Sequence, residues 1–202
     1  MRVGVLASGD GSNFQALVEG LQGTGEAEVV GLICNVPGAR VLERARGLGV
    51  PAVVMQHTQW PSRVAFDEAL AEELSLRQVG LVVLAGYMRL LTPAFLKVFP
   101  SKVINIHPAL LPAFPGLHAI RQALAAGVRV TGCTVHFVDG GTDTGPIISQ
   151  AAVPVLPDDD EAALAARIRV QEHRLLPLTV RALARGEVAV EGRRVSLKAP
   201  LA

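Results

Sequence analysis

Short apolar runs alternate with segments of helical spacing through the first half of the chain, and this rhythm limits the possible folds more than any other feature. The apolar runs, which we expect to be strands, are residues 3–7, 28–34, 52–55, 80–85 and 103–106. The segments of helical spacing between them are residues 14–21, 41–48, 62–74 and 93–99. Such alternation is typical of parallel sheets covered by helices. The sequence therefore predicts an α/β fold, a Rossmann-like open, mostly parallel twisted sheet with helices on both faces.

The second half of the chain follows another pattern. Residues 108–117 hold three prolines and a glycine, which favours an irregular but ordered loop before a short helix at 119–126. Apolar segments at 131–138 and 146–155 flank a turn rich in Gly, Thr and Asp, so we expect two antiparallel strands. Acidic residues at 158–161 favour the start of a long helix that ends near residue 185 and is perturbed at Pro177. The segment 188–197 predicts a terminal hairpin.

Charge and composition argue against several classes of partner. The formal net charge of +1 gives no reason to expect nucleic acid or a membrane surface. The two cysteines, Cys34 and Cys133, are far apart and form no Cys-x-x-Cys pair, so we expect neither a disulfide scaffold nor a zinc site. The apolar run at residues 3–7 is too short for a signal peptide or a membrane span. We therefore expect a cytoplasmic protein.

A glycine-rich turn follows the first expected strand. Gly9-x-Gly11-Ser12-Asn13 leads into a helix, and a helix N-terminus with close backbone approach suits a phosphate group. The dinucleotide motif requires a third glycine where this chain has Phe14, so the turn does not indicate NAD. The alternative is a plain strand-to-helix turn in which Ser12 or Asn13 caps the helix.

Two polar residues end the last strand of the first half. Asn105 and His107 alternate with Ile106, so both side chains point to the same side of the sheet. Ligands bind at the carboxyl edge of such sheets, where these two side chains could direct donors at one developing oxyanion. The alternative is a structural pair in which the two polar groups only satisfy each other and nearby backbone.

The turn between the two antiparallel strands carries Asp139 and Asp143. Both residues suit a tight turn, and both could serve only as caps. If Asp143 lies beside His107, its charge would favour the protonated imidazole, and its carboxylate could take up a proton directly or through water. We therefore treat Asp143 as a candidate catalytic residue and His118 as a candidate for orienting it. His136 falls inside a strand and is interpreted as a core histidine.

The order of these motifs resembles the glycinamide ribonucleotide formyltransferase family, from residue 3 to about residue 183. Besides the glycine turn, the matching motifs are Ala85-Gly86-Tyr87-Met88-Arg89, Asn105-Ile106-His107-Pro108-Ala109-Leu110-Leu111-Pro112, Phe114-Pro115-Gly116-Leu117-His118, Asp143-Thr144-Gly145-Pro146 and Gln171-Glu172-His173. The Asn-x-His-Pro motif is also similar to that of other formyltetrahydrofolate enzymes. The resemblance implies a single formyltransferase domain over residues 1–202, with a phosphate-binding half at 1–100, a catalytic and folate-binding half at 101–185, and a hairpin or tail at 186–202.

The resemblance also implies the reaction and its residues. A formyl group would pass from the cosubstrate 10-formyltetrahydrofolate to the amine of glycinamide ribonucleotide (GAR) in de novo purine biosynthesis, with no metal. The implied catalytic residues are Asn105, His107 and Asp143. The implied GAR-binding residues are Gly11, Ser12, Asn13, Arg169 and Glu172. The implied folate-binding residues are Arg63, Met88, Arg89, Leu90, Leu91, Asn105, Val138, Asp139, Gly140 and Asp143.

Two departures and several alternatives accompany this interpretation. Ala109 replaces a serine that is more frequent in the family, and Asp10 brings a negative charge into the expected phosphate loop, where we expect it to face solvent. One alternative is another 10-formyltetrahydrofolate enzyme, either a hydrolase or a transferase acting on tRNA or a nucleotide sugar. The other is a non-catalytic Rossmann module that binds a nucleotide. The expected partners are small molecules, and a homodimer is an open alternative to a monomer.

Overall fold

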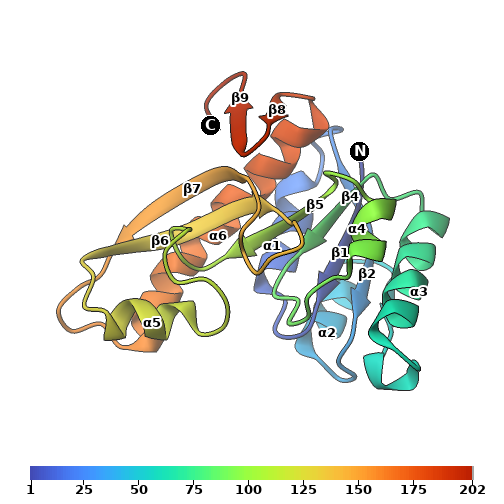
Figure 1. Cartoon of the computed structure of the whole chain (residues 1–202), viewed down its shortest axis with the longest axis horizontal. Helices are drawn as coiled ribbons and strands as arrows, with labels where there is room; N and C mark the ends of the chain where they lie inside the picture. Colours follow the sequence, from blue (N-terminus) through green and yellow to red (C-terminus); the bar gives the residue numbers. More distant parts are fainter. Residues whose placement is uncertain (202) are drawn as a thin grey trace. The chain divides into compact units, whose positions relative to one another are not determined.

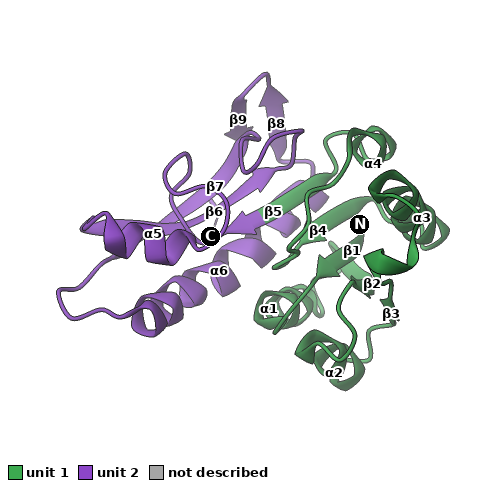
Figure 2. Ribbon diagram, turned by 60° about the horizontal axis from the view of Figure 1, so that its bottom comes forward, with its two compact units in different colours: residues 1–105 green, residues 106–202 purple. Residues whose placement is uncertain are grey.

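The computed structural model describes residues 1–201 and divides the chain into two compact units, residues 1–105 and the residues from 106 onward (Figure 2). Seven strands follow the order β3-β2-β1-β4-β5-β6-β7, and two further strands form a separate hairpin, β8-β9. The strands that pair within the first unit are all parallel, whereas β6 and β7 are antiparallel. The predicted α/β class with a mostly parallel sheet is therefore confirmed.

The first unit contains the alternation that the sequence predicts (Figure 1). Its strands are β1 (Arg2–Ala7), β2 (Glu28–Cys34), β3 (Ala52–Val54), β4 (Leu81–Leu84) and the first three residues of β5 (Val103–His107), whose last two residues belong to the second unit. Its helices are α1 (Ser12–Leu21), α2 (Arg40–Gly47), α3 (Arg63–Leu76) and α4 (Pro93–Val98), with a short 3-10 turn, η1 (His57–Gln59), that the sequence did not predict. Because crossovers between parallel strands are right-handed, α1 and α2 cover one face of the sheet and α3 and α4 the other (Figure 2).

Burial explains why the first-unit strands read as continuous apolar runs. All four residues of β4 are buried, and so are the last five of β1, because helices cover both faces of these central strands. Phe14 of α1 and Phe66 of α3 are fully buried and supply large side chains to the core. The carboxyl ends of β1, β4 and β5 then lead directly into the segments that carry the expected ligand-binding residues.

The second unit is built around an antiparallel pair and one long helix. Its elements are α5 (Ala119–Ala125), β6 (Val130–Phe137), β7 (Ile147–Pro154), α6 (Glu161–Ala184), β8 (Val188–Glu191) and β9 (Arg194–Leu197). Helix α6 packs against β6 and β7 and continues through Pro177, which is buried. The antiparallel pair and the terminal hairpin are as predicted. Among residues 1–201, no helix has the length and apolar character needed to cross a bilayer.

The start of α6 provides a test of this local structure. The carboxylate of Asp160 accepts a hydrogen bond from the backbone N–H of Ala163 at 2.7 Å and so caps the helix. We expect Asp160→Ala to lower the free energy of unfolding by about 1 kcal/mol, measured by urea denaturation. The control is Asp158→Ala, which removes a nearby exposed carboxylate outside the capping position. Equal stability of the two variants would contradict the assigned cap.

Candidate active site

The glycine-rich turn has the backbone geometry that a phosphate loop requires. Gly11 has a φ of 79° and is the N-cap residue of α1. A Cβ on Gly11 would lie 2.4 Å from Cγ2 of Val41 and 2.9 Å from its Cα, so only glycine fits here. Ser12 and Asn13 form the first turn of α1, where backbone N–H groups point along the helix axis. Because Gly11 occupies the N-cap position, the prediction that Ser12 or Asn13 would be the N-cap is wrong, whereas a plain strand-to-helix turn stays an alternative to a phosphate site.

Asp10, the unexpected acid in this turn, is paired with helix α2. Its carboxylate lies 3.1 Å from Nη1 of Arg40 and 2.9 Å from Nη2 of Arg44, and its side chain is half exposed. Slight burial raises the pKa of Asp10, but hydrogen bonds and charge from Arg44, and then from Arg40, lower it below its ordinary value. Arg44 also donates to the Asp10 carbonyl at 2.8 Å and to Gln15. The negative charge is thus balanced by α2, which holds the turn at several points.

A single hydroxyl connects the glycine turn to the segment after β4. Ser8 donates to Oδ1 of Asn35 at 2.6 Å and accepts from the backbone N–H of Met88 at 2.9 Å. The N–H of Ser8 also donates to the carbonyl of Gly86 at 3.0 Å. The expected phosphate loop and the expected folate segment are therefore joined at their first residues.

Four of the expected folate residues, Met88, Arg89, Leu90 and Leu91, lie in one loop, which we call the 87–92 loop (residues 87–92). Met88 and Leu90 are 63% and 53% exposed, whereas Leu91 is buried. Arg89 lies over the ring of Phe66, with Cζ 5.5 Å from the ring centroid, and Arg63 donates to the Leu90 carbonyl. Exposed apolar side chains beside two guanidinium groups fit a flat aromatic ligand with a carboxylate tail.

In the second unit, the structure brings His107 and Asp143 together. Nδ1 of His107 lies 3.3 Å from Oδ2 of Asp143, and Oδ2 also accepts from the N–H of Gly116 at 2.8 Å. Nε2 of His107 lies 2.8 Å from the carbonyl oxygen of Phe114. Both imidazole nitrogens therefore face oxygen atoms, and the predicted pairing of His107 with Asp143 is present. Asn105 is two residues earlier on β5, half buried, and points to the same side of the strand.

His136 is a partner of Asp143 that the sequence interpretation missed. Its Nε2 lies 3.5 Å from Oδ1 of Asp143, and its Nδ1 lies 2.8 Å from the carbonyl of Phe137. The available signal was its position near the end of β6, seven residues before Asp143 in a tight turn. His118, the alternative orienting residue, is exposed and begins α5 in a left-handed conformation.

The environment of Asp143 keeps its carboxylate ionised. Burial raises the pKa of Asp143, but the hydrogen bond from His136, then that from the Gly116 N–H and the charge of His107, bring it below the ordinary 3.8. The residue has a φ of 53°, a left-handed conformation that aspartate tolerates better than most side chains. The 138–145 loop therefore presents a charged acceptor between two imidazoles.

Other contacts shape the 138–145 loop. Asp139 accepts from the N–H of Gly141 at 3.0 Å and from the hydroxyl of Thr144 at 2.6 Å, so its carboxylate acts as a turn cap. Arg193, in the β8–β9 turn, donates to the Thr144 carbonyl at 2.9 Å. Val138, Asp139 and Gly140, which are expected to contact the folate, thus lie in a loop that is restrained by Asp139 within it and by Arg193 from the terminal hairpin.

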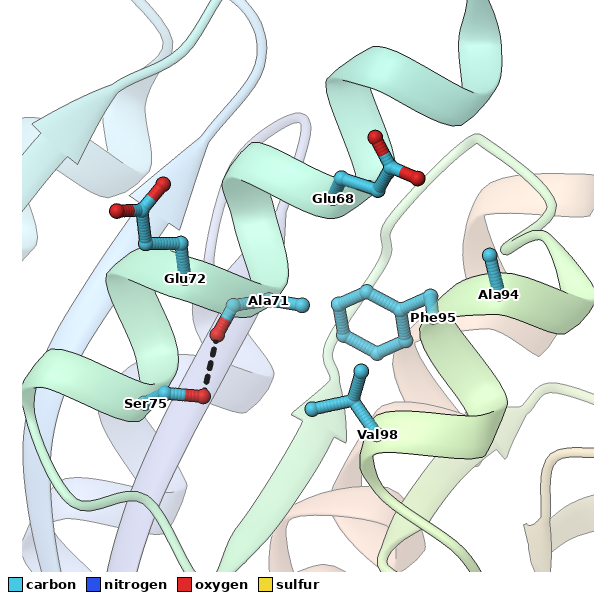
Figure 3. A pocket seen from close by; sticks show the side chains of 7 residues that line it. All are labelled: Glu68, Ala71, Glu72, Ser75, Ala94, Phe95 and Val98. Atoms are coloured by element: carbon cyan, nitrogen blue, oxygen red, sulfur yellow. Dashed lines mark hydrogen bonds between the residues drawn. The ribbon is translucent and has the colours of Figure 1, made fainter.

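The remaining expected residues are on α6, and a cavity in the first unit has a different lining. Arg169 is exposed on α6, and Glu172, one turn later on α6, is buried. A cavity of about 260 Å³ opens between α3 and α4 (Figure 3), and none of the expected site residues lines it. Within residues 1–201, no group of three or more His, Cys, Asp and Glu side chains could hold a metal ion.

Three comparisons with known proteins all point to formyltransferases. The model of the formyl transferase family matches residues 1–180. A phosphoribosylglycinamide formyltransferase from Bacillus subtilis is 44% identical and covers 89% of this chain and 92% of its own. The trifunctional purine biosynthetic protein adenosine-3 of Drosophila melanogaster is 46% identical over 94% of this chain, which spans only 14% of that protein. The crystal structure of glycinamide ribonucleotide transformylase 1 from Symbiobacterium toebii has a TM-score of 0.95 and 52% identity, covering 98% of this chain and 93% of its own.

The contrast between Gly11 and Gly9 tests the geometry of the glycine-rich turn. We expect Gly11→Ala to lower the free energy of unfolding by about 1–3 kcal/mol, because alanine meets Val41 and is strained at this φ. Gly9 has no atom within 4 Å of a built Cβ, so Gly9→Ala is the matched control and should change stability by less than about 0.5 kcal/mol. Chemical denaturation measures both. A harmless Gly11→Ala would show that the turn can relax, against the geometry described above.

His136→Phe tests the third partner of Asp143. Because His136 provides the largest pKa-lowering interaction, we expect the pKa of Asp143 to rise toward its ordinary value, as followed by NMR of the side-chain carboxyl. A lowered folded-state pKa stabilises the fold above the unfolded-state pKa, and this contribution is lost as pH falls through the folded value. The variant should therefore gain less stability from Asp143 at neutral pH. His118→Asn is the control, and an equal shift in both variants would contradict the assignment.

Proposed function

This chain belongs to the formyl transferase family, and we propose that it transfers the formyl group of 10-formyltetrahydrofolate to the amine of GAR, like the phosphoribosylglycinamide formyltransferases that it resembles. The observation that carries the proposal is the pair of His107 and Asp143, held with an ionised carboxylate at the end of β5. Agreement with the named relatives over most of both chains supports the same assignment. The two partners that we propose are therefore small molecules.

We assign the GAR phosphate to the turn at Gly11, Ser12 and Asn13. The left-handed Gly11 and the N-terminus of α1 offer backbone donors to a phosphate, and the pairing of Asp10 with α2 balances its negative charge. Arg169 and Glu172 are proposed to bind the phosphate and the ribose of the same substrate. For the folate, we propose the 87–92 loop with Arg63, together with Val138, Asp139 and Gly140 over the pteridine ring.

The proposed chemistry uses donors and one carboxylate, without a metal. The amine nitrogen of GAR attacks the formyl carbon, and the new oxyanion accepts hydrogen bonds from His107 and Asn105. Asp143 stabilises the protonated His107 and passes a proton from the attacking amine to the leaving folate nitrogen, directly or through water. As the new C–N bond forms and the old one breaks, the electrons and the proton end on the folate nitrogen.

His107 must exchange one partner to take this role. Its Nε2 already donates to the Phe114 carbonyl, and an oxyanion would have to replace that oxygen. A carbonyl oxygen and a carboxylate can only accept hydrogen bonds, so both ring nitrogens of His107 face acceptors. An oxyanion in the place of the Phe114 carbonyl would accept from the same Nε2–H.

His107→Ala tests the catalytic assignment. We expect kcat to fall by about 10²–10⁴-fold, because the variant loses both oxyanion stabilisation and the partner of Asp143. The KM values for GAR and for 10-formyltetrahydrofolate should change by less than about tenfold. The absorbance change on loss of the formyl group measures the reaction.

Omission of GAR from the same assay separates the proposed function from its rivals. A formyltetrahydrofolate hydrolase would release the formyl group without GAR, and a nucleotide-binding module would release none in either case. We expect formyl loss only when GAR is added. Near-normal turnover by His107→Ala, or a rate independent of GAR, would refute the proposal.

A further inference from the structure

One face of α3 contacts the 87–92 loop at three successive points. Arg63, Phe66 and Asp67 are spaced i, i+3 and i+4, so their side chains lie on the same side of the helix. Nε of Arg63 donates to the Leu90 carbonyl at 3.1 Å, and the ring of Phe66 lies beneath the guanidinium of Arg89. Oδ2 of Asp67 accepts from the N–H of Thr92 at 2.6 Å. The helix therefore contacts the middle and the end of the loop.

Asp67 is the unusual member of this face. Its side chain lies in the core, with the residue only 1% exposed, and an unpaired carboxylate there would be costly. The short bond to the Thr92 N–H is a charge-assisted bond that fixes the last residue of the loop, just before α4 begins.

Asp67 also influences the first residue of the loop. Burial raises the pKa of the Tyr87 phenol, and the negative charge of Asp67 raises it further, whereas Arg89 and Arg63 act in the opposite direction. The contact that holds the loop is the bond to the Thr92 N–H, whereas Tyr87 is affected only by the charge of Asp67. The groups that act electrostatically on Tyr87 are therefore Asp67 and Arg63 of α3 and Arg89 of the loop.

We infer that Asp67 is a positioning residue, which fixes the Thr92 end of the 87–92 loop so that Met88, Arg89 and Leu90 are presented to the folate. This inference rests on the proposed function of the loop. Asp67 is buried beneath the loop, so it would act through the loop backbone and need not touch the ligand. Loss of the carboxylate should therefore weaken folate binding, and should have little effect on GAR or on the chemical step.

The chain contains its own optical reporter of this region. Trp60 is the only tryptophan, and its ring packs edge-on against Phe66, with 6.3 Å between the ring centroids. Because Phe66 also lies beneath Arg89, we expect the emission of Trp60 to change when folic acid, a folate without a formyl group, binds at the loop. A fluorescence titration then measures folate binding without any turnover.

The experiment compares Asp67→Ala with Glu68→Ala. Glu68 is the next residue of α3, but it is exposed and lines the cavity on the α4 side (Figure 3), so its variant removes a carboxylate that does not contact the loop. For Asp67→Ala we expect the half-saturation concentration of folic acid and the KM for 10-formyltetrahydrofolate to rise about tenfold or more. The KM for GAR and kcat should stay within about threefold of the wild type. Glu68→Ala should match the wild type in all four values.

The outcomes distinguish this inference from the proposed function. Wild-type protein without GAR-dependent formyl transfer would refute the proposed function itself. Active wild type together with a folded Asp67→Ala protein that binds folic acid like Glu68→Ala would overturn the role of Asp67. If Asp67→Ala does not fold, Asp67→Asn decides the question, because the amide keeps the acceptor but loses the charge. We then expect half-saturation to rise about threefold or more, and an unchanged value would overturn the inference.

Discussion

The position of Asp143 between donors from three separate segments is the constraint around which the second unit is arranged. His107 comes from the end of β5, Gly116 from the proline-rich loop, and His136 from the end of β6. A carboxylate that burial disfavours remains ionised here only because these donors converge on it. The left-handed backbone at Asp143 is the local strain that accompanies this arrangement, and the surrounding contacts hold it in place.

In the first unit, too, carboxylates hold loops in place, at two positions. Asp10 ties the glycine turn to α2 through Arg40 and Arg44, and Asp67 ties the 87–92 loop to α3 through the Thr92 N–H. In each case a carboxylate beside a loop accepts bonds from a neighbouring helix or from the loop backbone. The two loops to which we assign ligand binding are thereby held by hydrogen bonds to carboxylates as well as by packing.

The sequence predicted the strands and helices well because burial on both faces produces unbroken apolar runs, such as β4, and helical spacing is distinct from them. The residues alone made the pairing of His107 with Asp143 a conditional hypothesis, and the family resemblance selected it, because local patterns do not say which distant turn approaches a strand end. His136 was missed for the same reason, since a histidine inside a strand has the pattern of any core residue. The pairing of Asp10 with α2 could not be predicted, because sequence spacing does not show where the side chains of Arg40 and Arg44 point.

The terminal hairpin, although it is far along the chain, contacts the 138–145 loop through a hydrogen bond. Arg193 lies beyond residue 180, where the match to the family model ends, yet its guanidinium holds the carbonyl next to Asp143. A substitution in a segment that the family model does not include can therefore alter the stiffness of the loop that carries Asp143. Two relatives with identical central residues need not have equally mobile loops.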